Sequence, residues 1–302
     1  MSKKIKSINR FNQNYKNFSF SDLTSRADIE YLELTLQFNN SGNLIEEIKY
    51  TTDSILEEKN NYEFDDKGKL ISHTLLYAID NVTEKKVLKR NEKGLLVTEV
   101  KYYGSDSGES THYEYNDKDN VTAIVLYDEE NIFVSREEIT YDEKGSLKER
   151  RTADSENKLL SRITFTSPAE NEIEEIDYNE NDAIVSRTVI KFNDKGKEIS
   201  SLQTNPQGKV ISSVLNTYDE TGNIIEKINK DFYSKKVLYA YNDNNLLISQ
   251  EIFDDSGLLL RKNMYEYDDD GNVTTEQTYE MDTTRGGRDK HFGTRYEYLF
   301  FD

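Results

Sequence analysis

The sequence predicts an all-β fold, an array of antiparallel β-hairpins, from three observations. A stretch at residues 265–273, YEYDDDGNV, recurs in a blurred form about every 26 residues along the chain. Within each copy, apolar and polar residues alternate on both sides of a turn, which is typical of two strands joined as a hairpin. The chain is also rich in strand-forming aromatic residues, with 21 Tyr and 13 Phe. About ten copies at nearly constant spacing indicate a repeat protein.

The repeated turn has Asp or Asn at its first position and usually Gly at its fourth. This pattern predicts a type I turn followed by a glycine bulge, in which the Asx side chain bonds the backbone and the fourth residue takes a positive φ. At residues 141–147, Asp142 should face Ser146, and Tyr141 should face Leu147. The fourth position holds Gly or a residue that tolerates positive φ, Asp or Asn: Gly42, Gly68, Gly94, Asp119, Gly145, Asn171, Gly196, Gly222, Asn245 and Gly271.

A second, weaker series of turn residues lies midway between these positions. It consists of Gly108, Asn157, Asp182, Gly208 and Gly257. Each period should therefore contain a turn at either edge of the sheet and two strands of about eight residues, in agreement with ordinary strand and hairpin lengths.

The strands should have one apolar, aromatic face and one charged face. The position just before the repeated turn is aromatic in most copies and is interrupted by Arg90: Phe38, Phe64, Tyr115, Tyr141, Phe165, Phe192, Tyr218, Tyr241, Tyr267 and Tyr298. Soluble proteins rarely expose so large an apolar face, and wide sheets rarely stay flat. We expect one large sheet curled into a half-pipe, spiral or shell with the apolar face inward. An open single-layer sheet shielded by Tyr and long charged side chains is the alternative.

The repeat indicates one domain over residues 31–302, although the 302-residue length alone would fit two. Residues 1–30 lie outside the repeat and are expected to be a lead-in that covers the first sheet edge. A short helix after Ser21 is one option there. The copy at Asn171 carries Pro168, which predicts a turn that bulges out of line. The apolar residues 299–301 are suited to capping the last strand.

Composition excludes several kinds of site and partner. Without cysteine there is no disulfide, thiolate metal site or cysteine nucleophile. The formal net charge is −19, from 39 basic and 58 acidic residues, so nucleic acid and anionic membranes are poor partners. The charge is either a solubilising coat or an attraction for a basic protein. The N-terminal residues lack the apolar run of a signal peptide, so we expect a cytoplasmic protein, with export by another route as the alternative.

No motif for catalysis, a metal or a cofactor stands out from the repeat. His73, His112 and His291 are scattered in sequence, which favours structural roles. The DDDGN stretch at 268–272 is similar to the opening of a calcium loop but lacks the later bidentate carboxylate, so turn chemistry explains it better. There is no P-loop or dinucleotide fingerprint. We therefore expect no enzyme activity, no bound metal and no cofactor.

Consecutive carboxylates are also poor candidates for a catalytic pair. Glu137 and Glu138 are adjacent in a predicted strand, as are Glu174 and Glu175. Neighbouring residues of a strand point to opposite faces, so neither pair should form an acid–base dyad.

The aromatic-Asp-x-x-Gly turns resemble those of the YD-repeat or RHS-like repeat family and, more distantly, of MORN-like antitoxin repeat proteins. The resemblance covers about residues 31–302 and implies a shell or scaffold. Family members that enclose toxins are much longer and carry a core signature. The nearest match here is the mid-chain NPQG at 205–208, which fits a repeat turn better, so self-cleavage and toxin delivery are not expected. The clearest copies are Tyr141-Asp142 with Gly145, Tyr218-Asp219 with Gly222, and Tyr267-Asp268 with Gly271.

Three classes of function follow as hypotheses. A non-enzymatic scaffold or protein-binding protein is favoured, because repeat sheets offer large surfaces. The first alternative is an immunity or antitoxin protein that neutralises a basic toxin. The second is a glycan-binding or glycan-cleaving protein that uses carboxylates beneath a Tyr platform.

The candidate partner site is the basic, Gly-rich segment that breaks the period after residue 280. We predict that Arg285, Arg288, Tyr279 and Phe292 contribute to a contact, because loops on a rigid scaffold often carry function. The contact would be self-association through the final edge strand or docking of another protein. The alternative is a solvated loop whose cations offset acidic repulsion.

Overall fold

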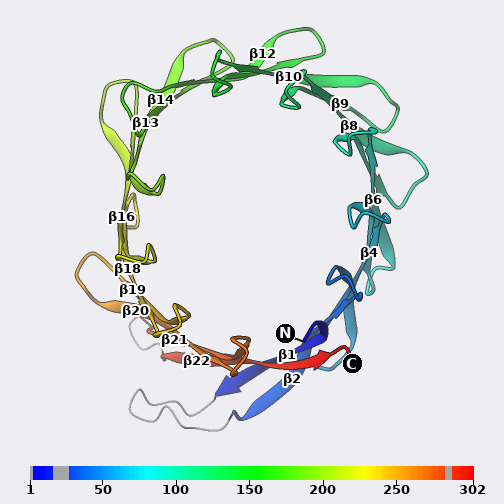
Figure 1. Ribbon diagram of the computed structural model, residues 1–302, viewed down its shortest axis with the longest axis vertical. Helices are drawn as coiled ribbons and strands as arrows, with labels where there is room; N and C mark the ends of the chain where they lie inside the picture. Colours follow the sequence, from blue (N-terminus) through cyan, green and yellow to red (C-terminus); the bar gives the residue numbers. More distant parts are fainter. Residues whose placement is uncertain (1–2, 16–26, 283–287) are drawn as a thin grey trace.

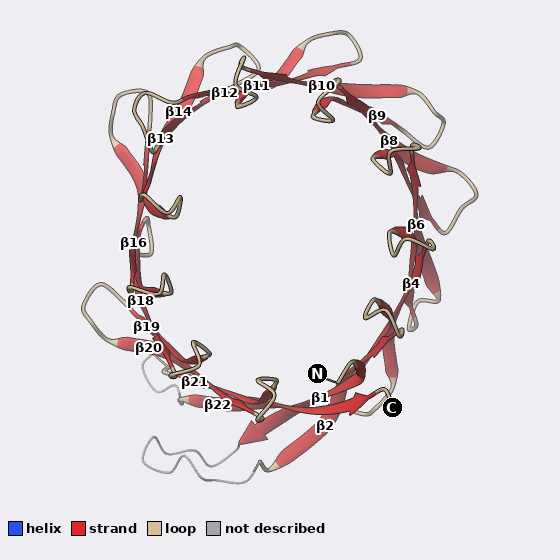
Figure 2. Ribbon diagram, in the orientation of Figure 1, coloured by secondary structure: helices blue, strands red, loops and turns tan. Residues whose placement is uncertain are grey.

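The computed structural model describes residues 3–15, 27–282 and 288–302. These residues form 22 β-strands in one sheet (Figures 1 and 2). Every pairing is antiparallel, and strands β2 to β22 pair in chain order. The predicted all-β hairpin array is therefore confirmed. Nowhere in the described ranges is there a helix with the length and apolarity that crossing a bilayer requires.

The strands are short, and β1 and β22 are the first and last of them along the chain. In order they are β1 (Ile5–Tyr15), β2 (Ile29–Phe38), β3 (Leu44–Tyr50), β4 (Leu56–Phe64), β5 (Leu70–Tyr77), β6 (Val82–Arg90), β7 (Leu96–Tyr103), β8 (Gly108–Tyr115), β9 (Val121–Tyr127), β10 (Phe133–Tyr141), β11 (Leu147–Asp154), β12 (Leu159–Thr166), β13 (Glu172–Tyr178), β14 (Ile184–Phe192), β15 (Glu198–Thr204), β16 (Val210–Tyr218), β17 (Ile224–Lys230), β18 (Lys235–Tyr241), β19 (Leu247–Phe253), β20 (Leu259–Tyr267), β21 (Val273–Glu280) and β22 (Lys290–Phe300).

Strand β1 closes the sheet into a barrel. It pairs with β2 on one side and with β22 on the other, so that Ile8 faces Leu36 and Tyr298. The half-pipe and spiral are therefore wrong, and the sheet forms a closed wall (Figure 1). Sequence analysis placed residues 1–30 in a lead-in and did not predict β1. Ser21 lies outside the described residues.

The repeated turn has the expected geometry. In the copy at residues 142–146, the amide of Gly145 donates to the carbonyl of Asp142 at 3.0 Å, and Asp142 pairs with Ser146 through a 2.8 Å backbone bond. Asp142 Oδ1 also accepts from the Ser146 amide at 2.8 Å. Tyr141 faces Leu147, as predicted. All ten predicted fourth positions have a positive φ, between 59° at Asn245 and 92° at Gly222.

The second series of turns is also present, with one correction. Asn157, Asp182, Gly208 and Gly257 have positive φ as predicted, but Gly108 does not. The turn glycine is Gly104, at φ 69°, and Gly108 begins β8. A Cβ at residue 108 would lie 2.4 Å from the carbonyl oxygen of Lys101, which explains why glycine stands there.

A bulge follows most hairpin turns and bends the wall. Beside the turn between β4 and β5, Glu63 faces Ser72 while Phe64 faces Leu70, so Ile71 is the extra residue. Hairpins at the opposite edge show the same shift, as between β3 and β4. Bulges increase the local twist and bend a strand. Their repetition around the wall gives the sheet the curvature that closure needs.

The turns at the two ends of the barrel lie at different distances from the centre of the ring. The turns at one end, which include the ten repeated turns, lie towards the centre of the ring, and the turns at the other end spread outward (Figures 1 and 2). We call these the inner rim and the outer rim. Both chain ends lie at the inner rim, where the Phe301 amide donates to the Lys4 carbonyl at 2.9 Å. With a strand spacing of about 4.8 Å, 22 strands make a ring at least roughly 34 Å across.

The aromatic face is aromatic only near the inner rim. Along β4, alternate residues running away from that rim are Phe64, Tyr62, Asn60 and Glu58. Farther round the wall, Glu137 lies on the same side as Tyr141 and pairs with Arg150 at 2.6 Å. The prediction of one wholly apolar face is therefore wrong, because charged side chains pair across strands on both faces.

Tyrosine hydroxyls join successive hairpins at the inner rim. The last aromatic residue of a strand donates to the first carbonyl of the preceding strand, beyond the end of the backbone ladder. Arg90, which interrupts the aromatic column, reaches the Leu70 carbonyl at 3.4 Å in the same way. The tyrosine bonds are 2.7–3.0 Å long and run from Tyr115 to Leu96, Tyr141 to Val121, Tyr218 to Glu198, Tyr241 to Ile224, Tyr267 to Leu247 and Tyr298 to Val273.

We predict that Tyr267→Phe lowers the free energy of unfolding by about 1 kcal/mol, because it leaves the Leu247 carbonyl without its donor. Tyr239→Phe is the matched control, since the Tyr239 hydroxyl has no such bond within the described residues. Urea denaturation of both variants measures the difference. Equal losses in the two variants would show that the bond adds nothing.

Candidate functional site

Of the four predicted contact residues, the three that the structure describes do not form one surface. Arg285 lies outside the described residues, and Arg288 is exposed in the connection between β21 and β22. Tyr279 is only 1% exposed. Because Tyr279 faces His291 while Thr278 faces Phe292, Tyr279 and Phe292 point to opposite faces of the sheet. The edge-strand route to self-association also lacks its edge, since β22 is paired on both sides.

Tyr279 belongs instead to a stack of three rings at the closure. Its ring lies 4.3 Å from that of His291, which lies 3.7 Å from the ring of Tyr15. The three residues come from β21, β22 and β1 and share one face. His291 is 3% exposed. Burial lowers its pKa to about 4 and, together with the charges of Tyr15 and Glu266, raises the pKa of Tyr279 to about 12.

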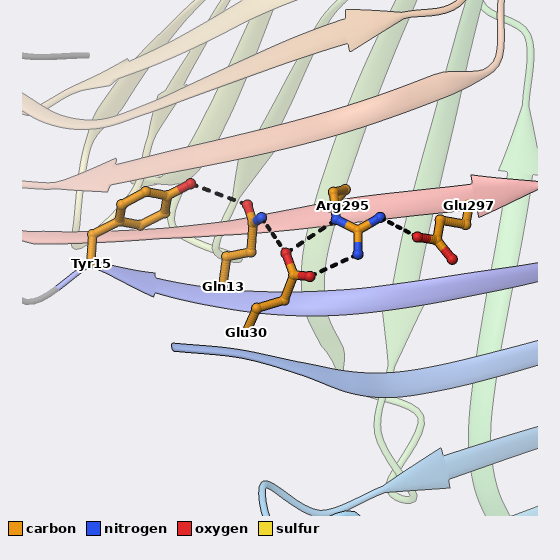
Figure 3. Close-up of polar contacts among 5 residues, drawn as sticks. All are labelled: Gln13, Tyr15, Glu30, Arg295 and Glu297. Atoms are coloured by element: carbon orange, nitrogen blue, oxygen red, sulfur yellow. Dashed lines mark hydrogen bonds and ion pairs between the residues drawn. The ribbon is translucent and has the colours of Figure 1, made fainter. Parts of the chain in front are cut away.

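An ion pair clamps the closing strand on the same face (Figure 3). Arg295 on β22 contacts Glu30 on β2 through two hydrogen bonds, of 2.7 and 3.1 Å. The strand between them is β1, and the Arg295 guanidinium lies 4.2 Å from the centre of the Phe11 ring on that strand. Gln13 donates to Glu30 at 2.6 Å, and Arg295 also bonds Glu297 at 2.6 Å.

These contacts join residues from opposite ends of the chain. The hydrogen bond to Glu30 is the largest cause of the raised pKa of Arg295, so the guanidinium stays charged at the closure. Short-range spacing gives no signal for this network, because Arg295 and Glu30 are 265 positions apart. Only the knowledge that the sheet closes would have paired them.

The same kind of clamp occurs once within the repeat wall. Arg136 on β10 reaches across β9 to Glu114 on β8 with two hydrogen bonds, of 2.8 and 2.7 Å. Beneath them on β9, Ala123 is fully buried. The hydrogen bond from Arg136 lowers the pKa of Glu114. This pair is a natural control for the clamp over β1.

The other two histidines have structural partners. His73 stacks on Tyr62 with 4.7 Å between ring centres, and its Nε2 donates to Asn60 Oδ1 at 2.7 Å. Burial, and then the charge of Lys86, lower the pKa of His73. His112 packs edge-on against Tyr127, with 5.3 Å between centres. Each imidazole is thus held by the wall.

The carboxylates that the sequence singled out have the predicted surroundings: Glu137 and Glu138 lie on opposite faces, and Asp268 belongs to a turn. Glu137 pairs with Arg150 while Glu138 lies near Arg136, 3.6 Å away on the other face. Asp268 accepts bonds from its own turn, chiefly from Asn272, which lowers its pKa. Across the described part of the chain, no group of three or more His, Cys, Asp or Glu has a metal-binding arrangement.

Lysines tie the turns of the inner rim to one another. Lys69 donates to the carbonyl of Gly94 in the next turn at 2.7 Å, and Lys197 donates to that of Gly222. Lys93 pairs with Asp119 at 2.7 Å. Acidic residues in these turns commonly precede a lysine, as in Asp66-Lys67, Glu92-Lys93, Asp117-Lys118, Glu143-Lys144 and Asp194-Lys195. The inner rim is therefore a mixed-charge edge whose cations cross-link the repeat.

The outer rim is acidic and lacks these cross-links. Its short turns, at 51–54, 78–81, 104–107, 128–131, 154–157, 179–182, 205–208, 231–234 and 254–257, contain no Lys or Arg. Within the described residues, Asp182, which Arg162 contacts at 2.8 Å, is the one turn carboxylate with an ion pair. The acidic residues of these turns are Asp53, Asp80, Asp106, Asp128, Glu129, Glu130, Asp154, Glu156, Glu180, Asp182, Asp231, Asp254 and Asp255.

Comparisons with known proteins find similarities to one family model and to solved structures. A family model described only as an uncharacterised protein matches residues 63–188. Curated proteins provide no match. Among solved structures, the complexes TcdB2-TccC3-Cdc42 and TcdB2-TccC3 are 11% and 9% identical, with TM-scores of 0.40 and 0.39. They match 86% and 84% of this chain, which spans only 17% and 16% of theirs.

A third solved structure matches nearly the whole length of both chains. It is a porin-like protein from Bacteroides uniformis, 10% identical, with a TM-score of 0.32. The match covers 98% of this chain and 96% of that one.

We predict that acidification loosens the closure through His291. The folded barrel keeps this imidazole neutral down to a pH of about 4, whereas the unfolded chain protonates it near 6.5. Stability from this group is thus full above pH 6.5 and falls as the pH drops towards 4, by at most about 3 kcal/mol. Urea denaturation at pH 7 and pH 4.5 of the protein and of His291→Phe gives the difference. An equal loss of stability in both would contradict the prediction.

We also predict that Arg295→Gln loosens β1 selectively, because Glu30 loses its partner across that strand. The expected loss is about 1 kcal/mol, since the pair is partly exposed. Hydrogen exchange should speed up in the amides of β1 and β22 and stay unchanged in β10 to β13. Arg136→Gln is the control and should affect β8 to β10 instead. The idea fails if both variants loosen the same strands.

Proposed function

We propose that this protein is a non-enzymatic binding ring whose outer rim engages a basic protein. The observation that carries the proposal is the series of outer-rim turns that contain carboxylates and neither lysine nor arginine. The net charge of −19 supports it, because an acidic chain attracts a basic partner.

The contrast between the rims supports a role beyond solubility. On the inner rim, cations bond neighbouring turns, as Lys195 does with the carbonyl of Glu220 at 3.2 Å. On the outer rim, exposed side chains such as Glu129, Glu130 and Glu156 extend from a closed wall without such bonds. A rigid row of like charges attracts an oppositely charged partner over a distance of about one Debye length and speeds its association.

The relationship to YD-repeat proteins is part of the same proposal. Its support is the turn itself: Tyr267 anchors the preceding strand through its hydroxyl, and Asp268 organises the turn through its carboxylate. A repeat that uses Tyr and Asp to fix hairpin geometry produces a wall, which fits a scaffold that presents loops.

Neutralising the outer rim should release the partner. We predict that Glu129→Gln, Glu130→Gln and Glu156→Gln together reduce the recovery of basic proteins on the immobilised ring by about tenfold at 50 mM salt, since each rim charge contributes roughly 0.5 kcal/mol. The source is a lysate of the cells that produce the protein, and mass spectrometry measures recovery. The bound proteins should have an excess of Lys and Arg and elute with increasing salt.

A triple variant of the inner rim is the matched control. Glu92→Gln, Glu143→Gln and Asp194→Asn remove the same charge from central positions of the inner-rim turns. This control should keep its partners. Equal losses in the two variants, or recovered proteins that are mainly neutral or acidic, would refute the proposal.

A further inference from the structure

A cavity of about 530 Å³ opens at the outer rim between β18 and β22. Its size is that of an ordinary small-molecule site. Four of its lining residues are cationic, although the short turns of this rim contain no cation. They are Lys235, Arg261, Arg288 and Lys290.

Three of these cations have no counter-charge within the described residues. Arg261 pairs with Glu280, but among the residues that the structure describes no carboxylate lies within ion-pair distance of Lys235, Arg288 or Lys290. Cations that gather around one cavity repel each other, and in a chain with a net charge of −19 they would be expected to pair with nearby acids. A bound anion would relieve that repulsion.

Two nearby carboxylates, those of Glu280 and Asp289, already have partners. The lining also includes Asp282, whose backbone amide donates to Asp289 Oδ1 at 3.0 Å. Asp289 thus bonds the connection that carries Arg288.

The rest of the lining is apolar. Ile252, Leu260 and Met281 come from three successive segments and face the same space. Such surface favours the carbon skeleton of a ligand over a bare inorganic ion. Cationic groups at the edge and apolar groups between them together specify an amphipathic anion.

We propose that this cavity binds a small organic anion that carries carboxylate or phosphate groups on an apolar skeleton. Arg288 and Lys290 hold the anionic groups from the β22 side, and Lys235 holds them from β18. The ligand packs its carbon atoms on Ile252, Leu260 and Met281. This site is independent of the acidic turns that attract a basic protein, and its ligand has the opposite charge.

Calorimetric titration with four probes tests the site. Phenyl phosphate and benzene-1,3-dicarboxylate combine charge with an apolar skeleton, and inorganic phosphate and acetate carry charge alone. At 150 mM salt, at least one of the aromatic probes should bind with 1:1 stoichiometry and at least about tenfold more tightly than its inorganic or short counterpart. Which of the two aromatic probes binds more tightly identifies phosphate or carboxylate as the preferred group.

The double substitution Lys235→Gln and Arg288→Gln should weaken that binding by about tenfold or more. Lys67→Gln with Lys144→Gln removes the same charge from the inner rim and should change affinity less than about twofold. Circular dichroism checks the fold, and Lys290→Gln alone serves if the double variant does not fold. No saturable binding by any probe, or equal loss in variant and control, would overturn the proposal.

The two proposals fail separately. The Lys235 and Arg288 variant should still retain basic proteins on the immobilised ring, because the acidic turns are unchanged. Loss of anion binding with retention of basic proteins therefore tests the cavity alone.

Discussion

The whole structure depends on the pairing of β1 with two strands at once. A single-layer sheet has no second layer to cover its edges, and an unpaired edge strand exposes a row of backbone donors and acceptors. Here one side of β1 pairs with β2 and the other side pairs with β22. Closure removes both edges and makes every described strand an interior one. At the closure, the buried stack on His291 and the clamp from Arg295 add side-chain contacts to this backbone pairing.

Turn geometry and turn charge are separate properties of this repeat. Both rims use Asx side chains that accept from the backbone and a fourth residue at positive φ, as in Asp65 to Gly68 and Asp254 to Gly257. The side chains at the other turn positions are free to vary, because the turn geometry does not depend on them. At the inner rim these positions hold acids together with lysines, some of which bond the next turn, and at the outer rim they hold acids without lysine or arginine. The fold therefore fixes the shape of both rims and leaves the chemistry of each rim to a few exposed positions.

Much of the fold could be predicted from local patterns, because local physics determines it. Positive φ at Asp119, Asn171 and Asn245 followed from residue type and spacing. The strands followed from alternation. What local patterns did not predict was β1: its sequence, IKSINRFNQNY, is largely polar and lacks the repeated turn. Its conformation is determined by the two strands it joins, and one of those lies at the other end of the chain.

The candidate sites were harder to predict for the same reason. Tyr279 was expected at a surface because it precedes a basic loop, yet the partners that bury it, His291 and Tyr15, meet it only through closure. The sequence alone does not explain why Arg90 interrupts the aromatic column. In the structure Arg90 donates to the Leu70 carbonyl, in the place of a tyrosine hydroxyl. The rim charges, in contrast, could be read from the turn positions once the rims were known.

The closure by β1 also sets an order of events in folding. Hairpins from β2 onward can pair as they are synthesised, because each contacts its neighbour in the chain. The bond between Glu30 and Arg295 spans 265 positions, so the ring can close only after the last strand exists. Contacts at such long sequence separation form slowly. Until then the nascent sheet has two unpaired edges, and the period between the first hairpin and the last strand is when this protein is most exposed to pairing with other chains.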